Sequence, residues 1–106
     1  MRPGQGMEAF FAAQGIAIVG ASDDITKIGG RPVHLLKKYG YGGPIYPVNP
    51  RGGTVQGLTA YASVRDLPTA PDMAVLAVPA AATANALRDC AARGVKAAVV
   101  LTSGFA

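Results

Sequence analysis

Short apolar runs alternate with longer amphipathic stretches along this chain. Four of the runs are predicted strands: residues 16–19, 44–48, 72–78 and 95–101. Each is rich in Ile, Val, Leu or Ala, which is typical of parallel strands buried on both faces. A fifth, short edge strand is predicted over residues 55–61. Helical patterns lie between the strands, so we expect right-handed βαβ crossovers in an α/β, Rossmann-like three-layer domain with a parallel sheet of about five strands.

Two predicted helices carry the amphipathic pattern. In the first, Pro32 suits a helix start and Gly40 an end. Its expected apolar stripe is Pro32, Leu35, Leu36 and Tyr39, opposite His34, Lys37 and Lys38. The second spans residues 80–93 and is expected to end at Gly94. Its expected core face is Ala84, Leu87, Cys90 and Ala91, with Asn85, Arg88, Asp89 and Arg93 facing solvent. Ser63 is a plausible N-cap for a one-turn helix between them.

The chain divides into a short leader and one domain. Residues 1–15 are predicted to form a tail and a short helix over residues 7–13. Residues 16–106 form the predicted Rossmann-like domain. A further helix is expected after the last strand, so we interpret the domain as truncated at its C-terminus and expect one face of its sheet to be incompletely covered.

Composition narrows the classes of function. The chain has 106 residues, 50% hydrophobic and 15% charged, with a net charge of +4. Its basic residues are scattered, whereas nucleic-acid binding favours a clustered stripe with aromatics. Its apolar runs are shorter than the roughly 20 residues of a membrane span. The single Cys90 excludes an intrachain disulfide and a cysteine-based zinc site, and is consistent with a cytoplasmic protein.

The candidate binding residues follow the predicted strands, because ligands of open α/β sheets bind at the carboxyl ends of strands. They are Gly20, Ala21 and Ser22; Asn49, Pro50 and Arg51; Val78, Pro79 and Ala80; and Thr102, Ser103 and Gly104. All are small, hydroxylated, amide-bearing or basic, and none forms a catalytic acid–base pair. The sequence therefore indicates a site that binds a nucleotide-like ligand.

The dinucleotide fingerprint G-x-G-x-x-G is absent, because Ser22 follows where its second glycine would stand. After the second strand the chain has Arg51 in place of the acidic residue that accepts ribose hydroxyls. A guanidinium there favours a ribose that carries a phosphate, as in NADP or coenzyme A (CoA). The longer loop with Lys27 favours CoA.

Several motifs in order carry a family resemblance over nearly the whole chain from about Phe10. They are Ile-Val-Gly-Ala-Ser at 18–22, Lys-Ile-Gly-Gly-Arg-Pro at 27–32, Gly-Pro-Ile-Tyr-Pro-Val-Asn-Pro-Arg at 43–51, Asp-Met-Ala-Val-Leu-Ala-Val-Pro-Ala at 72–80 and Gly-Val-Lys-Ala-Ala-Val-Val-Leu-Thr-Ser-Gly-Phe at 94–105. The chain resembles the N-terminal CoA-binding domain of NDP-forming acyl-CoA synthetases, a family that includes ADP-forming acetate–CoA ligases. That domain is similar to one in the succinyl-CoA synthetase alpha subunit.

The resemblance implies roles for the candidate residues. The glycine-rich turn, Gly20-Ala21-Ser22, would hold CoA, with Lys27 and Gly29 behind it. Arg51 would meet the nucleotide end, and the Val78-Pro79-Ala80 exit would lie against the pantetheine arm. The residues after the last predicted strand, Thr102, Ser103 and Gly104, also match the family, although the succinyl type has glutamate where this chain has Ser103.

The implied reaction converts acid, CoA and NTP to acyl-CoA, NDP and phosphate. Its phosphohistidine and ATP-grasp site belong to other domains or subunits, the expected partners of this chain, which alone would bind CoA without turnover. Alternatives are an NADP-binding oxidoreductase domain, a standalone CoA-binding or sensor protein, and the same domain fused to a protein acetyltransferase.

Three other features have simpler interpretations. We interpret His34 as a solvated helix residue and Cys90 as a small core residue. Asp23 and Asp24 are expected to be loop or capping residues because no third carboxylate accompanies them.

Overall fold

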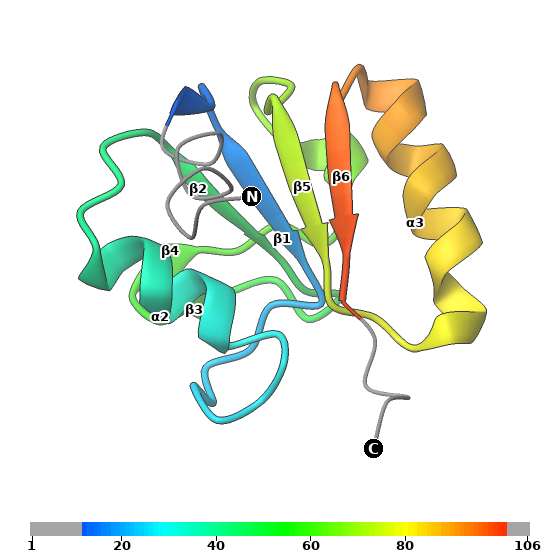
Figure 1. Cartoon of the computed structure of the whole chain (residues 1–106). Helices are drawn as coiled ribbons and strands as arrows, with labels where there is room; N and C mark the ends of the chain where they lie inside the picture. The colour runs from blue at the N-terminus through cyan, green and yellow to red at the C-terminus, as the bar shows by residue number, and fades with distance from the viewer. Residues whose placement is uncertain (1–11, 102–106) are drawn as a thin grey trace, which may run out of the picture.

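Four parallel strands form the centre of the structure, a computed structural model that describes residues 12–101 (Figure 1). They are β1 (Ile16–Val19), β2 (Ile45–Val48), β5 (Met73–Leu76) and β6 (Ala97–Val100), in the order β2-β1-β5-β6. Ile16 of β1 is in register with Ile45 of β2 and with Met73 of β5. All four strands point the same way, so their carboxyl ends lie at one edge of the sheet. The α/β, Rossmann-like fold expected from the sequence is confirmed.

The expectation of a fifth edge strand over residues 55–61 is wrong. This part of the described chain forms a separate two-stranded hairpin of β3 (Thr54–Val55) and β4 (Leu58–Thr59). Gln56 and Gly57 both have positive φ, of 49° and 81°, and this conformation reverses the chain within two residues. An isolated bridge then joins Tyr61 to Val48 at the end of β2.

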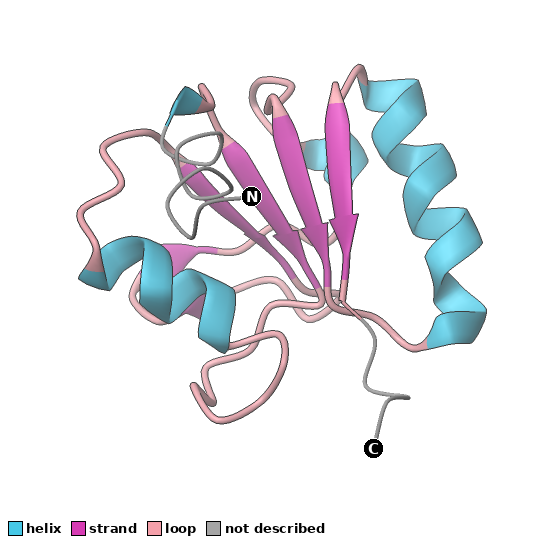
Figure 2. Cartoon of the chain, in the orientation of Figure 1, coloured by secondary structure: helices cyan, strands magenta, loops and turns pink. Residues whose placement is uncertain are grey.

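The helices cover opposite faces of the sheet, which creates the three layers (Figure 2). On one face, α2 (Arg31–Lys38) packs Val33 and Leu36 against Ile16 and Ile18. On the other, α3 (Ala80–Arg93) and the 3-10 turn η1 (Val64–Asp66) pack over Ala17, Ala74 and Leu76. Alternate residues of β1, β2 and β5 therefore serve two separate cores.

The predicted stripe on the first helix is partly wrong. Leu36 is buried as expected, and Val33 joins it in the core. Leu35 and Tyr39, however, are 39% and 56% exposed. The helix runs along one side of the sheet, so part of its apolar stripe extends beyond the strands that would cover it.

The core face predicted for α3 also needs correction. Cys90 is buried as expected, but the other buried residue is Ala86, while Ala84, Leu87 and Ala91 are exposed. Alanines occur on nearly every side of this helix, so their spacing gives a weak indication of its inner face. The helix bounds, by contrast, are confirmed, and Gly94 ends it with a left-handed φ of 89°.

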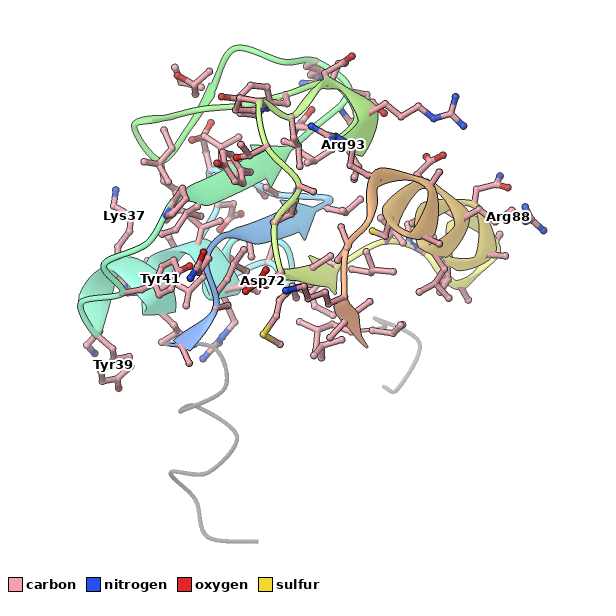
Figure 3. The ribbon with its side chains drawn as sticks, turned by 90° about the horizontal axis from the view of Figure 1, so that it is seen from above. Lys37, Tyr39, Tyr41, Asp72, Arg88 and Arg93 are labelled. Carbon is pink, nitrogen blue, oxygen red and sulfur yellow. The ribbon has the colours of Figure 1, made fainter. Side chains whose placement is uncertain are left out.

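Arg93 of α3, expected to face solvent, is partly buried and donates to the Leu67 carbonyl at 2.7 Å. Arg88 does point away from the body of the molecule (Figure 3). Ser63 caps η1 by accepting a hydrogen bond from the Arg65 N–H at 3.2 Å, as expected.

The edge strand β6 is the least covered part of the sheet. Ala97, Ala98 and Val100 are exposed, the last with 41% of its surface accessible. Successive strand residues point to opposite faces, so these exposed positions lie on both faces of β6 and not on the single face expected from the sequence. Most of the predicted helix over residues 7–13 lies outside the described residues. Within residues 12–101, no helix is long and apolar enough to cross a membrane.

Candidate functional site

The candidate site lies where the four strands end, and backbone hydrogen bonds tie their exits together. The N–H groups of Gly20 and Ala21 both donate to the Val48 carbonyl, at 3.0 and 3.1 Å. The Ala77 N–H donates to the Val19 carbonyl at 2.8 Å. Three of the four predicted exit segments are therefore adjacent. The fourth, Thr102-Ser103-Gly104, lies outside the described residues.

Gly20 is required where the chain leaves β1. Its φ of +87° is disfavoured for residues with a Cβ. A Cβ at this position would also fall on the backbone carbonyl of Ala77, at the exit of β5. β1 and β5 flank the point where the chain's connections diverge toward opposite edges of the sheet, which is where ligands bind in such folds. The glycine thus permits a close approach between the two exits that frame the site.

The loop over residues 22–30 follows this glycine and returns toward it (Figure 1). The Ser22 N–H donates to the Gly29 carbonyl at 3.2 Å, which closes the neck of the loop. Gly29 approaches so closely that a Cβ there would fall on the Gly20 carbonyl oxygen. A Cβ on Gly30 would fall on the Asp24 carbonyl oxygen. Two adjacent glycines therefore permit the compact shape of the loop.

The structure alters the expected role of the Gly20-Ala21-Ser22 turn. All three N–H groups donate within the protein, so they are not free to bind an anion in this structure. By contrast, the N–H groups of Ile28 and Gly29 have no hydrogen-bond partner among residues 12–101. They precede α2, whose N-terminus carries a partial positive charge. The amides that could bind an anion therefore lie at the end of the loop, in Ile28 and Gly29, and not at its beginning.

Asn49 has an internal role. Its amide nitrogen donates to the Ala21 carbonyl at 3.0 Å, and its side-chain oxygen accepts from the Arg51 N–H at 2.9 Å. It therefore joins the exit of β2 to that of β1 and shapes the turn that carries Arg51. Pro50 and Arg51 are exposed at this turn.

The remaining candidates lie on either side of these exits. Lys27 is exposed in the loop, and Val78 is half-buried at the exit of β5. Pro79 and Ala80 are exposed where α3 begins. The described candidates thus occupy the same edge of the sheet, as the sequence predicts, although their contact with a ligand remains a prediction.

Asp23 and Asp24 belong to the internal structure of the loop. The Asp24 carboxylate accepts from the Thr26 hydroxyl and N–H, at 2.6 and 2.9 Å, and these hydrogen bonds lower the pKa of Asp24. Asp23 accepts from the Gln56 N–H at 2.6 Å. Within the described part of the chain, no three His, Cys, Asp or Glu side chains gather in a metal-binding arrangement.

An apolar groove of about 360 Å³ lies beside the loop, between α2 and the open face of β5 and β6. It is lined by Ile28, Arg31, Pro32, Leu35, Leu36, Val75, Val99 and Leu101. Leu35, which the sheet leaves uncovered, thus lines this groove, whereas Tyr39 does not.

His34 and Cys90 are separate from the strand exits. His34 is half-buried on α2 beside a shallow hollow that also includes Thr26 and Arg31. Cys90 is buried in the core beneath α3, and burial, with a smaller effect of Asp89, raises the pKa of its thiol. Cys90 is a core residue, as expected.

Gln56 is a residue at the candidate site that the sequence did not lead us to predict. Its side chain reaches both ends of the loop at the site, although it comes from the hairpin after β2. Gln56-Gly57 between short apolar segments could have indicated a two-residue turn. No local pattern indicates the loop that its side chain reaches, since the contact spans 26 to 34 residues of sequence.

The chain belongs to the CoA binding domain family, whose model matches residues 14–106. It is homologous to the N-terminal region of ADP-forming acetyl-CoA synthetases. It is 42% identical over 99 residues to the acetate–CoA ligase [ADP-forming] II subunit alpha of Pyrococcus furiosus, a match that covers 93% of this chain and 21% of that protein. The chain therefore spans about a fifth of the length of this relative.

Solved structures agree with the family and the fold. The dinucleotide-forming acetyl-coenzyme A synthetase 1 of Ca. Korarchaeum cryptofilum, in complex with phosphate and ADP, is 43% identical with a TM-score of 0.84. That match covers 93% of this chain and 21% of the other. A conserved hypothetical protein from Pyrococcus furiosus is 32% identical with a TM-score of 0.73, over 83% of this chain and 74% of that one. The fold thus occurs both in long synthetases and in short proteins.

Proposed function

We propose that this chain is the CoA-binding module of an NDP-forming acyl-CoA synthetase. The observation that carries the proposal is that the chain belongs to the CoA binding domain family and that hydrogen bonds join the exits of its strands at one edge of the sheet. In the reaction of such an enzyme, acid, CoA and NTP give acyl-CoA, NDP and phosphate. The module would hold CoA and present its thiol, while a phosphohistidine and an ATP-grasp site on other domains or subunits would supply the chemistry.

In this proposal the loop over residues 22–30 meets the diphosphate of CoA. The donors available for it are the exposed ammonium of Lys27 and the N–H groups of Ile28 and Gly29, which have no partner within the described chain. Hydrogen bonds from charged donors to phosphate are stronger than neutral ones, so Lys27 would contribute most. Gly20, Ala21 and Ser22 would shape this part of the site through their backbone positions.

The two ends of CoA would extend to either side of the loop. Arg51, exposed on the turn that Asn49 and Pro50 form, would meet the phosphate on the ribose. The pantetheine arm would pass Val78, Pro79 and Ala80. Thr102, Ser103 and Gly104 complete the proposed set by their place in the sequence.

Isothermal titration with CoA, dephospho-CoA and NADPH tests this function. We expect CoA to bind best, and removal of its ribose phosphate to weaken binding by about tenfold or more, as expected for a charged hydrogen bond to phosphate. Arg51→Ala should reproduce that loss for CoA and leave dephospho-CoA binding unchanged. Arg88→Ala removes the same charge from the outer side of α3, where Arg88 donates to Asn85, and serves as the control.

Preference for NADPH would instead favour the oxidoreductase alternative. A second candidate function, a standalone CoA-binding protein, is favoured by the short Pyrococcus furiosus relative, of which this chain covers 74%. The two CoA-binding candidates differ in partners. Mixing the chain with ATP-grasp and phosphohistidine domains from the same genome should give acid-dependent CoA ligation only if the synthetase proposal is right.

A further inference from the structure

Gln56 occupies an unusual backbone conformation beside the loop of the candidate site. Among the residues that the structure describes, Gln56 is the one residue other than glycine with a positive φ, which is 49°. The first position of such a two-residue hairpin turn favours Asn, Asp or Gly, because other side chains are strained there. A glutamine at this position therefore has a conformational cost that its contacts must offset.

The side chain of Gln56 bridges the two ends of the loop over residues 22–30. Its amide nitrogen donates to the Ser22 carbonyl and to the Gly30 carbonyl, both at 2.9 Å. A side-chain amide has two N–H groups, so one residue satisfies both carbonyls at once. These partners stand at the neck of the loop, next to the hydrogen bond from Ser22 to Gly29.

Two further contacts hold the backbone of Gln56 in place. Its N–H donates to the Asp23 carboxylate at 2.6 Å. Its carbonyl accepts from the Lys37 ammonium on α2 at 2.7 Å. Gln56 thus joins the hairpin, the loop and α2, and both of its backbone contacts involve a charged partner, which makes them stronger than neutral hydrogen bonds.

The loop has further hydrogen bonds of its own, from the Lys27 N–H to the Asp24 carbonyl and from the Gly30 N–H to the Lys27 carbonyl, both at 3.0 Å, but these do not join its two ends. Residues 23–27 are all exposed, and the Ser22–Gly29 hydrogen bond at 3.2 Å is at the long end of the usual range. Without Gln56, the Ser22 carbonyl would lose its partner at the neck, and the Gly30 carbonyl would keep only the His34 N–H of α2, at 3.1 Å. The positions of the Ile28 and Gly29 N–H groups relative to the strand exits therefore depend on Gln56.

We propose that Gln56 is a positioning residue for CoA, which holds the loop closed so that the amides of Ile28 and Gly29 meet the diphosphate. This inference rests on the proposed function and extends it to a residue outside the strand exits. Because the ordering is present before the ligand arrives, binding loses less conformational entropy.

Gln56→Asn tests the role. Asparagine suits the turn better than glutamine, which offsets the loss of the side-chain hydrogen bonds, so we expect little change in the urea midpoint. Its side chain is one methylene shorter and cannot span both carbonyls. We expect roughly tenfold weaker binding of CoA and dephospho-CoA, the effect of losing one or two neutral hydrogen bonds. Pantetheine, which lacks the diphosphate, should bind both forms equally. Hydrogen exchange at Ser22 should accelerate in the variant.

Thr59→Ala on the same hairpin is the matched control and should change neither binding nor exchange. Gln56→Gly, which removes the side chain without strain at positive φ, replaces Gln56→Asn if that variant does not fold. Failure of the wild-type chain to bind CoA would overturn the proposed function and the role of Gln56 in it. Wild-type binding with unchanged affinity in Gln56→Asn would overturn the positioning role alone.

Discussion

The close packing of glycines at the strand exits leads to a prediction that separates backbone strain from steric contact. Gly29→Ala places a Cβ on the Gly20 carbonyl without a left-handed φ. Gly40→Ala does the reverse, since Gly40 has a φ of +77° and no atom of the described residues lies within 4 Å of the position that a Cβ would take. Gly20→Ala combines both effects, and Gly42→Ala has neither.

The magnitudes follow from these two contributions. A left-handed alanine costs about 1 kcal/mol, after allowance for the reduced entropy of the unfolded chain. Contact with a backbone carbonyl costs about 3 kcal/mol, because neither chain segment can move freely. We therefore expect losses in the free energy of unfolding of about 4 kcal/mol for Gly20→Ala, about 3 for Gly29→Ala and about 1 for Gly40→Ala, with Gly42→Ala close to neutral.

Urea unfolding followed by circular dichroism gives the four values. Equal slopes with denaturant are needed for the comparison, because a changed slope reports a changed folded or unfolded state. A Gly29→Ala variant as stable as Gly42→Ala would refute the reasoning, since the loop could then open without loss. If Gly20→Ala does not fold, Gly29→Ala and Gly40→Ala still separate the two effects.

Three other predictions concern parts of the fold outside the loop. Tyr41→Phe should lower stability by about 2 kcal/mol, because the hydroxyl accepts from the Gly15 N–H at 2.9 Å and its loss leaves that buried group unpaired; thermal unfolding measures this. Cys90 should react with a thiol reagent much more slowly in the folded than in the unfolded chain, since burial raises the pKa of its thiol. The raised pKa also links folding to pH: the stability contributed by the protonated thiol is present below the ordinary thiol pKa and is lost as the pH rises through the raised value. Asp89→Asn should change stability by less than about 0.5 kcal/mol, as the Arg65–Asp89 pair at 3.2 Å is largely exposed, and a larger loss in urea unfolding would contradict this.

Local sequence patterns predict the main sheet and its helices well. Ile16–Val19 and Ala80–Arg93 have the expected bounds, because a fully apolar run and a Pro–Gly pair at the ends of a helix act locally. The pattern fails for the inner face of α3 and for the hairpin. In α3 alanines surround the helix, and in the hairpin Gln56 adopts a turn conformation that its residue type does not favour.

The edge of the sheet that carries the site is also predictable, since strand order alone brings the exits together. The use of the individual polar groups is not. Asn49 and the Gly20-Ala21-Ser22 amides are engaged internally, and this depends on hydrogen bonds between residues far apart in the sequence. Gln56 illustrates the same limit, because its two carbonyl partners become neighbours only after the loop and the hairpin have folded.

The most direct test of the account is a titration of the isotopically labelled chain with CoA, monitored by backbone amide resonances. We predict saturable shifts that cluster at the carboxyl edge, in Lys27, Ile28 and Gly29 and on the turn of Arg51. Residues at the opposite edge, such as Tyr41 and Lys96, should not shift. Saturable shifts confined to that opposite edge, or no shifts at millimolar CoA with the fold intact, would contradict the central claim that the strand exits bind CoA.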